Sequence, residues 1–145
     1  MRAALLVLLA ACTAPKARPG PPDANPGPSF ARDIVPVLEH ECARQKGCHG
    51  DKPAEDVDMD LRPNAAYAAL VGVTAEQREG ALRVKPFDPD GSFIVDKLTG
   101  RLQGHDGKQM PIDPVTGSSV DPSPLPPGFV DQILVPWIAA GARRN

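Results

Sequence analysis

The chain has 145 residues, which is enough for one domain of ordinary size but not for two. Its formal net charge of -2 and its aromatic content of 4% provide neither a basic surface nor a stacking surface, so we expect no nucleic-acid partner. Proline occurs 18 times, where an average usage of about 5% would give about seven, so long uninterrupted helices are not expected throughout the chain.

The first twelve residues carry the features of an export signal. Arg2 gives a positive start, and residues 3–11 are all apolar. A helix that spans a bilayer needs about 20 apolar residues, whereas a run this short is typical of a cleaved signal. The run ends in Leu9-Ala10-Ala11-Cys12, which resembles the lipobox of bacterial lipoproteins.

The lipobox resemblance implies a signal peptide at residues 1–11 and a lipidated Cys12 that holds the mature chain on the membrane. Because Thr13 is not Asp, it also implies no inner-membrane retention, so we expect an anchor in the outer membrane that faces the periplasm. The alternatives are a plain secretory signal, or a cysteine buried in a short helix. Residues 13–29 contain six prolines and no large apolar side chain, so we interpret residues 12–29 as a disordered tether and residues 30–145 as the folded domain.

The first and last of four expected short helices each contain a proline. Because proline is tolerated in the first turn of a helix, Pro36 makes Asp33 the expected N-cap of the first. The last is expected at about 129–140, where Pro136 would kink the helix or delay its start. The spacing predicts these apolar faces: Phe30, Ile34, Val37, Leu38 and Cys42 in the first helix, and Phe129, Ile133, Trp137 and Ala140 in the last.

Two shorter helices are expected between them. Asn64 is the expected N-cap of a helix at 65–71 that stops near Gly72. Asp88 or Asp90 is the expected cap of a helix at 93–98 that Gly100 ends. No segment shows the sustained alternation of a strand, so the predicted fold class is all-α, with long Pro- and Gly-rich loops.

A short motif with chemical potential follows the first helix: Cys42, then five residues, then Cys48-His49-Gly50. Together with other segments, it resembles small bacterial c-type cytochromes, above all the planctomycete-type cytochrome c domains and related envelope lipoproteins. The resemblance covers most of residues 30–145, in the order of the family. Its other pieces are residues 30–38, 67–71, 83–86, 92–98, Met110-Pro111 and 137–142.

This resemblance implies a cytochrome c-like domain that binds one haem c and transfers electrons to an unidentified redox partner protein. Cys42 and Cys48 would be the attachment thiols, His49 the proximal iron ligand and Met110 the distal one. His105, five residues before Met110, is the reserve ligand. Trp137 and Phe30 would pack near the haem. No nucleophile motif, phosphate loop or acid pair stands out, so we predict no enzyme.

The cysteine spacing departs from the family pattern C-x-x-C-H. At about 100° per residue, six steps leave Cys42 and Cys48 about 240° out of phase on a continuous helix, so residues 43–47 must loop out. The spacing leaves open whether the haem is attached by two thioethers, by a single thioether through Cys48, or by none. The alternative is a Cys42–Cys48 disulfide in a haem-free envelope lipoprotein that uses the scaffold for interaction. A zinc site is a further option. Its ligands would come from His40, Cys42, Cys48, His49 and His105, although their spacing matches no common zinc motif. Met59, between acidic residues, is expected to be exposed.

Overall fold

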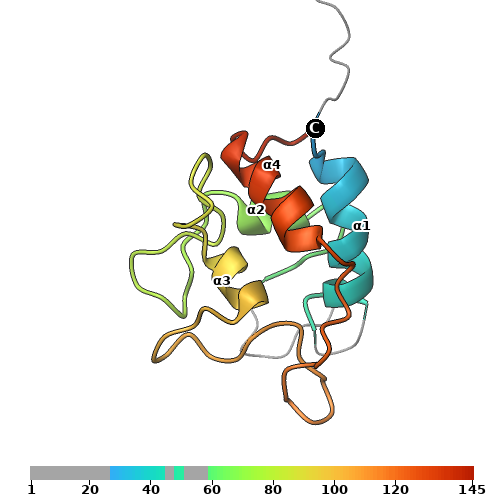
Figure 1. The fold of residues 1–145 in the computed structure, drawn as a ribbon, viewed down its shortest axis with the longest axis vertical. Helices are drawn as coiled ribbons and strands as arrows, with labels where there is room; N and C mark the ends of the chain where they lie inside the picture. Colours follow the sequence, from blue (N-terminus) through green and yellow to red (C-terminus); the bar gives the residue numbers. More distant parts are fainter. Residues whose placement is uncertain (1–26, 45–47, 51–58) are drawn as a thin grey trace, which may run out of the picture.

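The protein is described by a computed structural model that covers residues 27–44, 48–50 and 59–145 (Figure 1). Over these residues it is helical and has no β-strand, as the sequence predicts; pairing outside the helices is limited to isolated bridges such as Val71 with Val84. The signal peptide, Cys12 and nearly all of the expected tether lie outside the described residues. The elements are η1 (Phe30–Ile34), α1 (Val35–Val37), η2 (Leu38–Ala43), α2 (Ala66–Leu70), α3 (Phe93–Thr99), η3 (Phe129–Leu134) and α4 (Val135–Ala139).

The elements η1, α1 and η2 form one continuous helix, and it begins earlier than expected. Ser29 is its N-cap, because the hydroxyl oxygen of Ser29 accepts a hydrogen bond from the backbone N–H of Arg32 at 3.3 Å. The carboxylate of Asp33 accepts one from the backbone N–H of Ser29 at 2.7 Å. The expectation that Asp33 is the N-cap was therefore wrong: Asp33 supports the cap from inside the helix. Ser29, the residue before the expected start of the domain, is buried.

Both prolines lie beyond the first turn of their helices, and a wide π-helical turn precedes each of them. The N–H of Val35 donates to the carbonyl oxygen of Phe30, five residues back, directly before Pro36. The N–H of Val135 donates to the carbonyl of Val130 in the same way, directly before Pro136. A proline ring clashes with the carbonyl four residues earlier in a regular α-helix, and the wider turn relieves this contact. Pro136 thus does not delay the last helix, which begins at Phe129.

The π-helical turn also changes which side chains of the last helix are buried. Leu134, five residues after Phe129, is fully buried, whereas Ile133 is only half-buried. Ala140 is exposed and lies just beyond the helix. The expected face assumed a regular 3.6-residue period. It was correct at Phe129 and Trp137 and wrong at Ala140; Ile133 packs against the core but is only partly buried, and the face missed Leu134.

The two middle helices end as expected but begin differently. Asn64 is exposed, and the N-cap of α2 is Ala65, without a side-chain hydrogen bond. The N-cap of α3 is Ser92, whose hydroxyl donates to the carbonyl oxygen of Asp88 at 2.8 Å. Asp88 therefore organises the turn before α3 and does not cap the helix. Gly100, with φ of 77°, ends α3 in the left-handed conformation that glycine adopts without strain.

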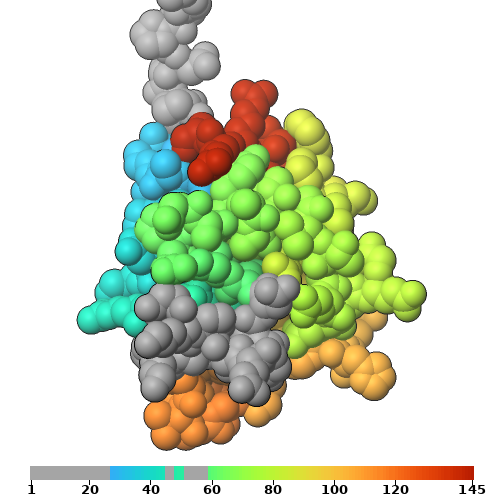
Figure 2. Space-filling view, turned by 180° about the vertical axis from the view of Figure 1, so that it is seen from behind, coloured from blue at the N-terminus to red at the C-terminus, as the bar shows by residue number. Residues whose placement is uncertain are grey.

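The first and last helices pack together and carry the core on their shared side (Figure 1). The ring of Phe30 lies 5.3 Å from that of Trp137 and meets the ring of Tyr67 edge-on at 5.2 Å. The N–H of Ala31 donates to the carbonyl oxygen of Asn145 at 2.9 Å, which joins the start of the first helix to residues after the last one. From behind, residues 60–100 cover the face between the first helix and the loop that follows α3 (Figure 2).

Candidate functional site

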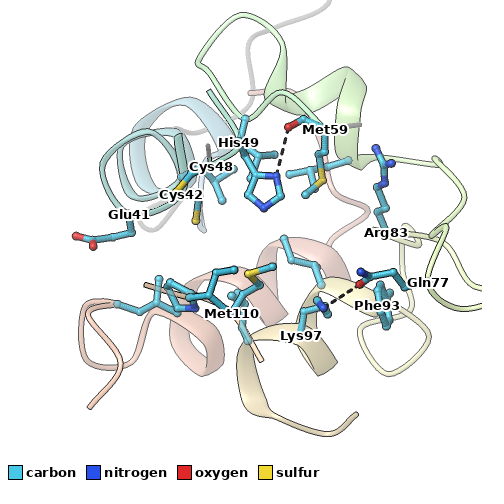
Figure 3. Close-up of a pocket in the computed structure, with 18 of the residues that line it drawn as sticks. Glu41, Cys42, Cys48, His49, Met59, Gln77, Arg83, Phe93, Lys97 and Met110 are labelled. Carbon is cyan, nitrogen blue, oxygen red and sulfur yellow. Dashed lines mark hydrogen bonds between the residues drawn. The ribbon is translucent and has the colours of Figure 1, made fainter. Parts of the chain in front are cut away.

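A cavity of about 470 Å³ lies between the end of the first helix, α3, the loop after α3 and η3 (Figure 3). Its volume is within the range of roughly 300–1,000 Å³ that is usual for cofactor and small-molecule sites. Apolar side chains from across the chain form much of its wall: Leu38, Leu61, Leu70, Phe93, Leu98 and Phe129. Such a wall excludes water from whatever the cavity holds.

Both cysteines of the motif and the adjacent histidine line one side of this cavity. The backbone N–H of His49 donates to the carbonyl oxygen of Cys42 at 3.0 Å, which brings Cys48 and His49 back to the end of the first helix. Gly50 is buried there, and a Cβ atom at this position would clash with the carbonyl oxygen of Ala43. Glycine is thus required where the chain passes so close to the helix end.

The ring of His49 points into the cavity with one nitrogen held by the protein (Figure 3). Its Nδ1 lies 3.3 Å from the carbonyl oxygen of Met59, so Nδ1 carries the proton and donates it. Burial lowers the pKa of His49, and the positive charges of Arg83 and Lys97 lower it further against the opposing effect of the Met59 hydrogen bond. The lone pair of Nε2 is therefore available in the cavity, which is the usual preparation of a metal-binding histidine.

Met110 lies on the opposite side of the cavity from His49 (Figure 3). Its backbone N–H donates to the carbonyl oxygen of Lys97 in α3 at 2.8 Å. The side-chain amide of Gln109 donates to the carbonyl oxygen of Leu98 at 3.1 Å, so the loop is fastened to the end of α3 at two successive residues. The structure thus brings together all four of the residues expected at the site: Cys42, Cys48, His49 and Met110.

Other residues expected near the site lie elsewhere. His105, the reserve ligand of the sequence analysis, is exposed and does not line the cavity. Phe30 and Trp137 are core residues but do not line the cavity. His40 is exposed and contacts Glu41 and Arg44. In the described part of the chain, no three His, Cys, Asp or Glu side chains converge as ligands of a metal ion.

Met59 belongs to the site, although its acidic neighbours led to the expectation that it is exposed. It is half-buried and lines the cavity, and its carbonyl orients His49. The N–H of Leu61 donates to the carbonyl oxygen of His49 at 2.8 Å. Met59 and Leu61 thus both form hydrogen bonds with His49. The sequence signal was the alternation of Met59 and Leu61 with charged residues, which is typical of a segment with one buried face.

A second group that sequence reasoning missed is polar and lies at the end of the cavity away from the cysteines (Figure 3). Lys97 is 8% exposed, and its amine donates to the side-chain oxygen of Gln77 at 2.9 Å and to the carbonyl oxygen of Asp106 at 2.8 Å. Arg83 also lines the cavity and donates to the carbonyl oxygen of Ala69 at 2.9 Å. The sequence could have indicated this position, because Lys97 follows the apolar Phe93 by four residues and therefore lies on the same, inner face of a short helix.

The two thiols are protonated at neutral pH. Burial raises the pKa of Cys42 to about 12, with the charge of Glu41 adding to the effect, and burial also raises the pKa of Cys48. Because the thiolate is the form that binds metals and attacks electrophiles, the pair is not activated for either role. Neither thiol is joined in a disulfide in the structure.

The residues around the cavity fit a haem with respect to donor chemistry. An imidazole nitrogen and a thioether sulfur face each other, two thiols stand beside the imidazole, and the walls are apolar.

Among the described helices, none has the length and apolar character needed to cross a bilayer. Neither a protein-family model, nor a curated protein, nor a solved structure matches the chain.

Proposed function

We propose that the protein carries one c-type haem in this cavity and transfers electrons at the bacterial cell envelope. One observation carries the proposal. His49 and Met110 are 61 positions apart, yet they face each other across a single apolar cavity that both cysteines also line. A core-filling methionine or a surface histidine has no need of such an arrangement.

Each site residue has a role in this proposal. Cys42 and Cys48 would hold the porphyrin through thioethers, and His49 Nε2 and Met110 Sδ would ligate its iron. When bound, the haem supplies a one-electron couple between ferric and ferrous iron. The carbonyl of Met59 keeps the His49 ring in position, and the apolar wall keeps water away. The domain is a cytochrome c-like electron carrier and not an enzyme.

The anchor and the partner complete the proposal. Lipid on Cys12 holds the domain at the outer membrane, on its periplasmic side, and the proline-rich segment separates the two. The partner is another redox protein, which exchanges electrons through the haem edge. Histidine and methionine ligation favours a raised reduction potential, because a thioether stabilises ferrous iron.

The proposal is tested by asking whether haem is covalently attached to the chain. The full chain is produced in a bacterial host that has haem-attachment machinery, and the denatured protein is separated on a gel and stained for haem peroxidase activity. The wild-type band should stain, and its intact mass should exceed that of the lipidated chain by one haem. A Cys42→Ala, Cys48→Ala double variant should lose the stain. An unstained wild-type band without the added mass would contradict covalent attachment.

A second candidate is a haem-free lipoprotein stapled by a Cys42–Cys48 disulfide. It is favoured by the hydrogen bond from His49 to Cys42, which brings both cysteines to the same side of the cavity. Closing so small a loop contributes about 2 kcal/mol of stability in the chain-entropy model. The same mass measurement separates the two, because the disulfide form is lighter than the reduced chain by two hydrogens and carries no haem.

A further inference from the structure

The amine of Lys97 is buried at the wall of the cavity, and no carboxylate of the described residues accepts a hydrogen bond from it. Its two acceptors, Gln77 Oε1 and the backbone oxygen of Asp106, are neutral, and an ammonium group has three protons to donate. The carboxylate of Asp106 is near enough for its charge to act on Lys97, but it accepts hydrogen bonds from Arg78, which contacts both of its oxygens. No other carboxylate of the described residues forms an ion pair with Lys97.

The arginines around Lys97 pair with carboxylates. Arg78 contacts the carboxylates of Asp96 and Asp106, and Arg101 contacts those of Asp96 and Asp90. Arg83 also lines the cavity, and its guanidinium lies 3.6 Å from the carboxylate of Glu76. A buried cation is costly unless a negative group accompanies it, so an anionic group of the occupant would be stabilised here.

The position of Lys97 and Arg83 relative to the cysteines is informative. The thiols line one end of the cavity and Lys97 and Arg83 line the other (Figure 3). Haem has the same polarity, because its two vinyl groups lie on one half of the macrocycle and its two propionate carboxylates on the other. One orientation therefore satisfies both ends at once.

We propose that Lys97, in a cavity that Arg83 also lines, is a carboxylate-binding site that holds a propionate of the haem and so fixes the orientation of the macrocycle. This inference rests on the proposed function, since it takes haem as the occupant. It adds a role for two residues that neither attach the porphyrin nor ligate the iron. The ammonium donates a charge-assisted hydrogen bond, and these are about twice as strong as bonds between neutral groups.

The test compares haemin with haemin dimethyl ester, which differ only at the carboxylates. The full-length chain is isolated from cells that lack haem-attachment machinery, and each compound is titrated into it while the Soret absorbance is followed. Wild-type protein should bind haemin about tenfold or more tightly than the ester, as one charge-assisted hydrogen bond implies. A site that recognises only the apolar body would instead favour the less polar ester.

Three variants assign the preference to Lys97. Lys97→Met should abolish the preference, and Lys97→Arg should retain it because the guanidinium is also a carboxylate donor. Lys85→Met is the matched control, since Lys85 is an exposed lysine paired with Asp88, and it should retain the full preference. Circular dichroism spectra of the variants check that each is folded.

These outcomes test the carboxylate-binding site independently of the proposed electron-transfer function. Equal binding of the two compounds by wild-type protein, or a preference that survives in folded Lys97→Met, would overturn the carboxylate site and leave the haem stain to decide electron transfer. Uptake of neither compound would overturn the site as well. A wild-type preference that Lys97→Met loses and Lys97→Arg keeps would support it.

Discussion

At the scale of single residues, the site depends on backbone groups as much as on side chains. The carbonyl of Met59 holds Nδ1 of His49, and the carbonyl of Cys42 holds the His49 backbone. The residues with a recognisable motif, Cys42, Cys48 and His49, could be predicted from the sequence. The role of Met59 could not, because a main-chain oxygen acts there and its position depends on the fold and not on residue type.

The protection of Cys42 gives a prediction for the reduced, haem-free chain. Burial raises its pKa from an ordinary value of 9.0 to about 12, so the thiolate fraction at pH 8 falls about a thousandfold. Iodoacetamide should therefore modify Cys42 far more slowly in the folded chain than in the same chain unfolded in urea, where the two cysteines should react at similar rates. Peptide mass spectrometry at timed intervals measures this. Equal rates at Cys42 in both states would contradict the buried position.

At the scale of elements, the wide turns before Pro36 and Pro136 explain where sequence reasoning succeeded and failed. The segments that become helices were predicted, and Gly100 was correctly identified as a helix end. The start of the first helix and the inner face of the last were not. Apolar spacing assumes 3.6 residues per turn, and a π-helical turn violates this assumption without a residue type that announces it. The prolines were the available signal, since each requires relief of a backbone clash.

The register of the last helix gives the second prediction. Leu134 is 1% exposed, so Leu134→Ala should lower the free energy of unfolding by about 2–5 kcal/mol. Ile133 is only half-buried, so Ile133→Ala should cost clearly less. Urea unfolding of the two variants, followed by circular dichroism, compares them directly. A larger loss at Ile133 would show that the helix has a regular α-helical register.

At the scale of the whole molecule, an arginine joins the segments that present the distal side of the site. Arg78 contacts Asp96 in α3 and Asp106 in the following loop, and its guanidinium lies 4.6 Å above the ring of Phe93. That loop carries Met110. The position of Met110 thus depends on contacts between segments far apart in sequence, which explains why the family resemblance pointed to the residue but not to what holds it.

The Arg78 cluster gives a prediction about pH. The hydrogen bond from Arg78 lowers the pKa of Asp106 below its ordinary value of 3.8, so the pair stabilises the fold above that value. The contribution is lost as the pH falls through the lowered pKa and Asp106 becomes protonated. Arg78→Met should therefore destabilise the chain at pH 7, and the difference from wild type should shrink below about pH 4. Urea unfolding of wild type and variant at pH 7 and at a pH below about 4 measures this difference in stability.

A control and a contrary result define that experiment. Arg32→Met removes an exposed arginine paired with Asp33, so it should change stability little at pH 7. If Arg78→Met is no more destabilising than Arg32→Met, or if its effect does not depend on pH, the cluster does not join these segments as described.

The absorption spectrum of the full chain, purified from a host that attaches haem, tests the central claim most directly. We expect a haem spectrum and, in the oxidised protein, a weak near-infrared charge-transfer band from sulfur to iron. Met110→Ala should keep the haem and lose this band, because its sulfur is the distal ligand. A wild-type protein without haem absorption would contradict the account as a whole, and a haem spectrum that Met110→Ala leaves unchanged would contradict the assignment of Met110.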